Sequence, residues 1–220
     1  MRTETLAPAR AWAVTALLAA APLVASAIPG ITDPAGDFLS TYGGASTDTD
    51  LDVVSATVLY DASLDLFRLS ATMAGTIGGT AGHLYVWGVN RGAGAVNAGF
   101  AANGIDGVRF DRVVILNQDG TGSVAGVGAL PAGAVTITGR TIAATVSGAM
   151  LTSTGFGKID YTWNLWPRDA KYAGFAQISD FAPDNASFTT TAGAVPEPAA
   201  VAMLLGGLGV VVAAARRRRA

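Results

Sequence analysis

The sequence lacks cysteine and has a single histidine, His83, among its 220 residues. Without cysteine there is no disulfide and no thiolate nucleophile, and one histidine cannot complete a closed tetrahedral zinc site. A Ser-His-Asp triad would have to use His83, and the Gly-x-Ser-x-Gly turn that presents the nucleophile of many hydrolases is absent. We therefore expect His83 to be a half-buried strand residue and the protein not to be an enzyme.

Glutamate is nearly absent, since Glu4 and Glu197 are the only two in the chain. The region 28–193 therefore owes its acidity to fourteen aspartates, set against eight lysines and arginines, which leaves a net charge near −6. A nucleic-acid partner requires a basic surface. The composition excludes nucleic acid as a partner, and the length of this region is enough for one domain with an apolar core.

The N-terminal segment has the three parts of a secretory signal peptide. Arg2 and Arg10 give it a positive start, an apolar run follows over 11–24, and Ala25 and Ala27 form a small-x-small cleavage site. We expect signal peptidase to cut after Ala27, so that residues 1–27 form a signal helix that is removed. The alternative, a first amphipathic helix of the domain, is disfavoured because the run is apolar on all sides.

The C-terminal segment is apolar and ends in four arginines. Residues 199–215 carry no charge and as a helix reach about 25 Å, close to the thickness of a hydrocarbon core of about 30 Å. The cluster Arg216 to Arg219 can reach the headgroups and stay on the cytoplasmic side, so the preceding domain faces outward. We predict a transmembrane helix over 199–215. A buried C-terminal core helix would leave the arginines unexplained.

A short extended break precedes this apolar run. Pro196 and Pro198 flank Glu197, and two prolines so close cannot lie inside a helix. A Pro-Glu-Pro, a short apolar helix and a terminal arginine cluster, in this order over 194–220, resemble the PEP-CTERM sorting signal of Gram-negative bacteria. The resemblance implies that an exosortase in the inner membrane recognises Pro196, Glu197 and Pro198 and cuts near them. The protein would then reach the cell surface or the extracellular matrix.

Apolar and polar residues alternate with period two through the region 28–193. Phe67, Leu69 and Met73 alternate with polar neighbours, and the run 51–60 before them predicts a hairpin partner joined through the loop 61–65. Gly139 occupies the position that a tight hairpin turn reserves for glycine. Further strands are predicted over 83–89, 108–116, 135–138, 142–146 and 161–165.

Many short strands without intervening helices are typical of an all-β fold. We predict a single antiparallel β-sandwich of about eight or nine strands over 28–193, jelly-roll-like or immunoglobulin-like. The glycine-rich stretch 88–107 is too long for a tight turn, so we expect a mobile or functional loop there. The motif "DPAGDF" at 33–38 and the stretch 48–73 resemble the first part of DOMON-like and carbohydrate-binding-module-nine-like sandwiches. That resemblance implies a binding domain for sugar, haem or calcium.

Aspartates gather where the predicted sandwich begins. Asp33 and Asp37 flank a Pro-Ala-Gly turn, and Asp48, Asp50 and Asp52 follow at every second residue. In an extended chain such carboxylates project from one side, and converging oxygens suit calcium. We predict a calcium site of Asp33, Asp37, Asp48 and Asp50, and take Asp52 as a weaker candidate because it lies inside the strand. The alternative is that these residues cap turns and solvate an edge strand.

The aromatic residues allow a second kind of site. Tyr161 and Trp163 share one face of a predicted strand and Trp87 lies in another, which is the pattern of a core wall. Trp166 falls on the opposite face and precedes a proline, so it is the aromatic that we expect to be exposed and to bind a ligand.

Three functions follow from these observations. The first is a non-enzymatic surface or matrix protein with a structural or adhesive role, in a biofilm for example. The second is a carbohydrate-binding module for extracellular polysaccharide, which rests on the aromatics and the resemblance of the body. The third is a secreted glycosidase, which needs a pair of carboxylates that the sequence does not single out.

Overall fold

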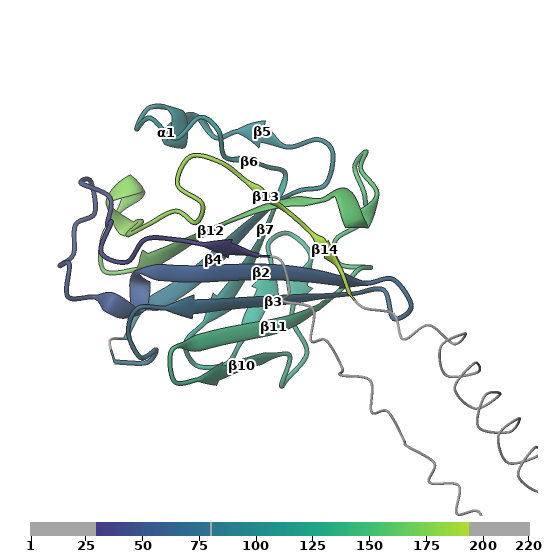
Figure 1. Cartoon of the computed structure of the whole chain (residues 1–220), viewed down its shortest axis with the longest axis horizontal. Helices are drawn as coiled ribbons and strands as arrows, with labels where there is room; N and C mark the ends of the chain where they lie inside the picture. The colour runs from purple at the N-terminus through teal and green to yellow at the C-terminus, as the bar shows by residue number, and fades with distance from the viewer. Residues whose placement is uncertain (1–29, 80, 194–220) are drawn as a thin grey trace, which may run out of the picture.

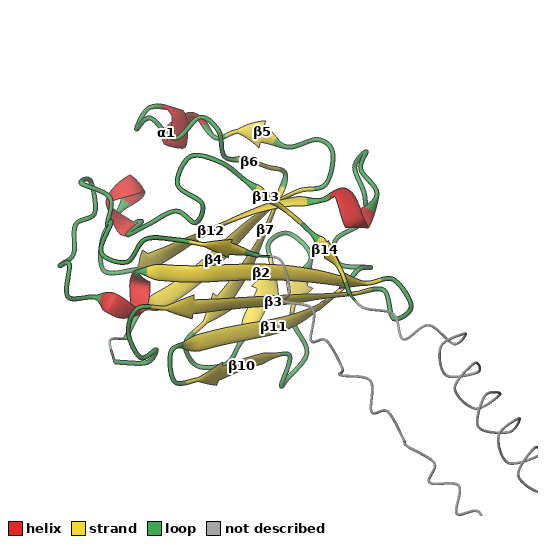
Figure 2. Ribbon diagram, in the orientation of Figure 1, coloured by secondary structure: helices red, strands yellow, loops and turns green. Residues whose placement is uncertain are grey.

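Two β-sheets packed face to face form the protein in the computed structural model, which describes residues 30–79 and 81–193 (Figure 1). Strands dominate and helices are confined to single short turns (Figure 2). The predicted signal helix, the predicted helix 199–215 and the Pro196–Glu197–Pro198 motif lie outside the described residues. Within the described ranges, no helix is long and apolar enough to span a membrane.

The first sheet has the order β1-β2-β3-β11-β10, and β14 also pairs with β2. All its pairs are antiparallel except β14 with β2, which is parallel. Its strands are β1 (Ile31–Thr32), β2 (Val53–Asp61), β3 (Leu66–Met73), β10 (Val135–Thr138), β11 (Thr141–Ser147) and β14 (Thr191–Ala192).

The second sheet has the antiparallel order β13-β12-β4-β7-β8-β9. Its strands are β4 (His83–Asn90), β7 (Arg112–Asn117), β8 (Gly122–Val124), β9 (Gly128–Ala129), β12 (Thr162–Asp169) and β13 (Phe188–Thr189). A separate pair is formed by β5 (Ala95–Val96) and β6 (Arg109–Phe110). The helical turns are η1 (Thr49–Leu51), α1 (Ala98–Ala101), η2 (Lys158–Asp160) and η3 (Gly174–Gln177).

The predicted all-β sandwich is confirmed, and the long strands fall where alternation placed them. In β3, Phe67 and Leu69 are buried and Arg68 between them is exposed. The turn between β10 and β11 has Gly139 at φ +58°, as the turn sequence predicted. The predicted number of strands was too low, because the structure adds strands of only two or three residues, too short to show a period.

The main core lies between the two sheets. Alternate side chains of β2, β3 and β11 meet those of β4, β7 and β12, and most are fully buried. Phe67 lies at its centre, with its ring centroid 5.5 Å from those of both Tyr161 and Trp163. Trp87 and Trp163 are each 0% exposed, so both are core residues as predicted.

A smaller core covers the outer face of the second sheet. Val86 and Trp166 project from β4 and β12 on that side and pack against Phe100, Ile178 and Phe181. The glycine-rich stretch 88–107 begins in β4 and continues through β5 and α1, which lie with β6 in the upper part of Figure 1; its residue Phe100 belongs to this core. Both faces of β4 and β12 are covered, so no residue of either strand is exposed.

The first and last strands of the described chain, β1 and β14, both pair with β2. β1 pairs with β2 at Ser55 and Ala56, and β14 pairs with β2 at Leu59 and Tyr60. The two short strands therefore follow one another along a single edge of β2. The first and last described strands of the chain thus lie on the same edge of the first sheet.

Candidate functional sites

Three carboxylates meet where the chain enters the sandwich. Asp33, Asp37 and Asp180 each place an oxygen atom within 4.8 Å of the other two. Asp180 is buried, and Asp33 and Asp37 are half-buried. Asp33 and Asp37, which the sequence analysis singled out, thus lie together, and Asp180, which it did not name, lies beside them.

Backbone hydrogen bonds fix these carboxylates. β1 ends with a hydrogen bond from the Asp33 N–H to the Val54 carbonyl at 2.9 Å. Beyond this bond, at Val53, no described strand pairs with this edge of β2. The free N–H of Val53 donates instead to Asp180 Oδ2 at 2.9 Å, across 127 residues of sequence. The N–H of Leu39 donates to the Ser179 carbonyl at 2.8 Å. Segments 33–39, 53–54 and 179–180 are thus tied together.

Two more aspartates lie beside the cluster. Asp52 Oδ2 accepts the N–H of Gly36 at 2.8 Å, so its side chain faces the turn between Asp33 and Asp37. Gly36 adopts φ +87°, the left-handed conformation that favours glycine in such a turn. Asp184 is exposed and interacts electrostatically with Asp33 and Asp37. Asp52 was taken as the weakest candidate in the sequence, yet the structure places it against this turn.

Burial raises the pKa values of the clustered carboxyl groups. It raises the pKa of Asp33 to about 7, and repulsion from Asp37, Asp184 and Asp52 adds to the effect. It raises the pKa of Asp180 to about 8, although two backbone hydrogen bonds act in the opposite direction. Burial is also the largest cause of the raised pKa values of Asp37 and Asp52. The negative charges are therefore poorly solvated in this cluster.

Asp48 and Asp50, the other predicted calcium ligands, lie elsewhere. The segment that carries them is not extended, because Thr49–Leu51 forms the helical turn η1 and rotates Asp50 away from Asp52. Asp48 Oδ2 accepts the Tyr42 hydroxyl at 2.8 Å and the Ala45 N–H at 3.0 Å. Asp50 Oδ2 contacts the ring of His83. The prediction that Asp48, Asp50 and Asp52 project from one side of an extended chain is wrong.

His83 is enclosed between two buried aspartates. Its Nδ1 lies 2.8 Å from Asp50 Oδ2, and its Nε2 lies 3.8 Å from Asp169 Oδ2. The His83 side chain is 0% exposed, so it is more deeply buried than the half-buried strand residue that we expected. No bound substrate can reach a ring in this position without movement of the strands around it.

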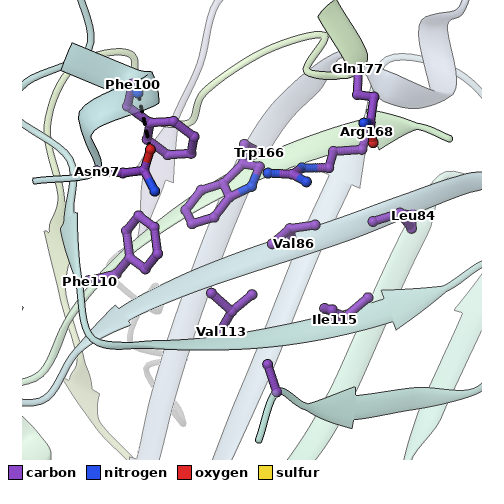
Figure 3. A pocket seen from close by; sticks show the side chains of 11 residues that line it. Leu84, Val86, Asn97, Phe100, Phe110, Val113, Ile115, Trp166, Arg168 and Gln177 are labelled. Atoms are coloured by element: carbon purple, nitrogen blue, oxygen red, sulfur yellow. Dashed lines mark hydrogen bonds between the residues drawn. The ribbon is translucent and has the colours of Figure 1, made fainter. Parts of the chain in front are cut away.

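A pocket of about 450 Å³ opens on the outer face of the second sheet (Figure 3). Apolar side chains of β4, β6, β7 and α1 form most of its wall, and Arg168, Asn97 and Gln177 supply polar groups. Its lining comprises Leu84, Val86, Asn97, Phe100, Phe110, Val113, Ile115, Ala125, Trp166, Arg168 and Gln177.

Trp166 lines this pocket and is 1% exposed, so the prediction of an exposed ring is wrong. The cause is the glycine-rich stretch, which was expected to be a loop and instead covers the indole. Phe100 and Phe110 lie with ring centroids 5.2 and 5.1 Å from Trp166. The ring offers no open face for stacking on a sugar.

The C-terminal segment gives the clearest comparison with known proteins. Residues 194–219 match the model of the PEP-CTERM protein-sorting motif. The chain carries an exosortase sorting signal. The match includes Pro196, Glu197 and Pro198 and confirms the resemblance drawn from them. This signal indicates export and membrane-associated sorting toward the cell surface, with exosortase as the processing partner.

The remaining comparison is negative, since a search of curated proteins finds no match to the chain. The likeness of the body to DOMON-like and carbohydrate-binding-module-nine-like domains stays a prediction.

Proposed function

We propose that the β-sandwich is a non-enzymatic component of the cell surface or extracellular matrix, with a structural or adhesive role. This proposal rests on the position of the sorting motif directly after the last strand of the domain. The sorting motif begins at residue 194, directly after β14 (Thr191–Ala192) has closed the edge of the first sheet. The domain is thus the part that an exosortase would deliver, after signal peptidase has removed residues 1–27 and the apolar segment 199–215 has held the protein briefly in the inner membrane.

The absence of an enzymatic role is supported by the position of the titratable groups. The only histidine of the chain is enclosed between Asp50 and Asp169. The pocket beside Trp166 has no aspartate or glutamate in its lining, and a glycosidase needs two carboxyl groups that flank the bound sugar. The glycosidase alternative therefore receives little support.

The carbohydrate-binding alternative rests on the same pocket. Arg168, Asn97 and Gln177 provide polar groups beside aromatic rings, as sugar-binding sites do. However, the wall is mostly apolar and Trp166 is covered, so the geometry favours the structural role. Pull-down of the exported protein with extracellular polysaccharide from the same cells separates the two. If the polysaccharide retains the unaltered protein but not the Arg168→Ala variant, polysaccharide binding would replace the structural role as the proposed function.

Cell fractionation tests the proposed function. In cells with an active exosortase, we expect the domain at the surface and in the matrix. In cells from which the exosortase gene has been deleted, we expect it in the inner-membrane fraction. Deletion of the gene for this protein should weaken cell-to-cell cohesion without removing any glycosidase activity from the medium. Equal distribution in both strains would contradict the sorting route, and unchanged cohesion would contradict the structural role.

A further inference from the structure

Aspartates from three distant parts of the chain converge at the entry to the sandwich. Asp33 and Asp37 come from the turn after β1, Asp52 directly precedes β2, and Asp180 follows η3. Asp184 lies close enough to act electrostatically on the first two. Five carboxylates therefore share one small region.

Among the described residues, no basic side chain forms an ion pair with these five aspartates. Within residues 30–79 and 81–193, every lysine, arginine or histidine that forms an ion pair does so with another aspartate: Asp50, Asp61, Asp65, Asp111 or Asp169. A buried charge needs a partner of opposite charge or a metal ion. Where these carboxyl groups are ionised, a bound cation would compensate their charge.

Several oxygen atoms in the cluster also lack a hydrogen-bond donor. Asp52 is 3% exposed, and its Oδ1 has no partner among the described residues although its Oδ2 is held by Gly36. The atoms Asp33 Oδ2 and Asp37 Oδ1 are also buried, although their residues are half-buried as a whole, and neither has a hydrogen-bond partner in the described part of the chain. Buried polar atoms without a partner are rare in proteins, and a bound cation would satisfy a group of acceptors such as this one.

We propose that Asp33, Asp37 and Asp180 bind one calcium ion, with Asp52 and Asp184 adding negative charge beside it. Oxygen ligands of calcium lie about 2.3 to 2.6 Å from the ion, so any two of them are at most about 5 Å apart. The three carboxylate oxygens meet this condition, since all lie within 4.8 Å of one another. Asp33 and Asp37 are half-buried, which leaves a side open for water to complete the six to eight ligands.

The ligand set favours calcium over the other common divalent ions. It has neither the nitrogen nor the sulfur ligands that zinc prefers. Magnesium demands a near-ideal octahedron and keeps most of its water, whereas calcium accepts several carboxylates in an irregular arrangement. The carboxylates here come from separate segments held by backbone hydrogen bonds, an arrangement that a larger and less demanding ion fits better.

The bound ion joins the beginning and the end of the domain. It ties the turn after β1 to the segment that leads from η3 toward β13, next to the bond from Val53 to Asp180. The inference depends on the fold alone, and the outcome of its test is independent of the role proposed for the protein outside the cell.

The test is thermal unfolding of the exported protein after treatment with EDTA and dialysis. Addition of millimolar calcium chloride should raise the melting temperature by about 5 to 10 °C, as expected for a ligand near a hundred times its dissociation constant. Magnesium chloride at the same concentration should raise it far less. Calorimetric titration with calcium chloride should give one ion per molecule.

The variants are Asp37→Asn and Asp180→Asn, both of which retain an oxygen acceptor. Each should lower the affinity for calcium at least tenfold, and Asp37→Asn remains informative if Asp180→Asn does not fold. Asp106→Asn, an aspartate outside the cluster, is the matched control and should bind calcium like the unaltered protein. Equal melting temperatures with calcium and with EDTA would overturn the proposal. So would an equal shift with magnesium, or calcium binding that survives Asp33→Asn combined with Asp37→Asn.

Discussion

His83 Nδ1 lies 2.8 Å from Asp50 Oδ2 and joins the first residue of β4 to the helical turn η1. The Nε2 atom on the other side of the ring faces Asp169 Oδ2 at the end of β12. All three side chains are at most 9% exposed. The imidazole therefore separates two buried carboxylates and connects η1, which leads into β2 of the first sheet, to β4 and β12 of the second sheet.

Replacement of His83 by alanine should lower the free energy of unfolding by about 3 kcal/mol, because it leaves Asp50 and Asp169 buried without this partner. Urea unfolding followed by tryptophan fluorescence measures the change. His83→Gln keeps an N–H that can reach Asp50 and should lose less. A loss below about 1 kcal/mol in His83→Ala would show that the ring does not hold this end of the sandwich.

Phe67→Ala should cost about 3 to 5 kcal/mol, since it removes a fully buried ring from the middle of the main core. The ring is also stacked on Tyr161, so an aromatic contact is lost with it. Chemical unfolding of the exported protein gives the magnitude.

Arg68→Ala is the matched control on the same strand. Its side chain is 52% exposed and lies 3.8 Å from Asp61, a surface pair that contributes about 0 to 1 kcal/mol. If both variants lost the same stability, the assignment of inner and outer faces of β3 would be wrong.

Arg91 and Asp111 give the domain an acid-sensitive contact. Arg91 Nε donates to Asp111 Oδ1 at 2.9 Å, and Asp111 Oδ2 accepts the hydroxyl of Thr154. Burial acts to raise the pKa of Asp111, but these hydrogen bonds outweigh it and lower the pKa below the ordinary 3.8. The folded state therefore binds this proton more weakly than the unfolded state does.

The contact should stabilise the fold fully above pH 4, and its contribution should disappear as the pH falls below 3.8 through the lowered pKa of Asp111. Unfolding free energies measured between pH 2 and pH 6 test this. Asp111→Asn should be less stable than the unaltered protein at pH 6, and the difference should shrink as the pH falls toward 2. A constant difference over the whole range would contradict the pKa assignment.

Glu197→Ala should leave the sorting segment attached and keep the protein in the inner membrane, because it alters the centre of the Pro-Glu-Pro motif. Intact-mass analysis of the protein from cells with an exosortase should show that the unaltered protein lacks Arg216 to Arg219. Glu4→Ala, which changes the other glutamate of the chain, should be processed normally. Arginines retained on most unaltered molecules would mean that the segment serves only as an anchor.

The long strands could be predicted from the sequence because apolar, buried residues alternate along them with polar, more exposed ones. Phe67 and Arg68 differ in kind and lie on opposite faces of β3, so the pattern revealed the strand. β4 and β12 are buried on both faces, and there alternation carries no information about which side is covered. For this reason Trp166 was assigned to the surface, although Phe100, 66 residues before it in the chain, covers it.

The acidic site was only half predictable for a similar reason. Asp33 and Asp37 flank one turn, so their spacing in the sequence was enough to predict that they lie close together. Asp180 joins them through a hydrogen bond that spans 127 residues to Val53, a relation that no local pattern contains. Asp48 and Asp50 had the right spacing for an extended chain, but η1 changed the direction of Asp50. Tertiary contacts, and not residue type, decided which aspartates meet.

The position of β14 on the edge of β2 has a mechanical consequence for a protein attached through its C-terminal end. A pull along the chain from residue 194 reaches Thr191 and Ala192 before any other strand. β14 pairs with β2 only at Leu59 and Tyr60. In contrast, β3 pairs with β2 over the whole length from Val53 to Asp61. Under load β14 should therefore detach first, and the tether lengthens while the rest of the first sheet stays folded.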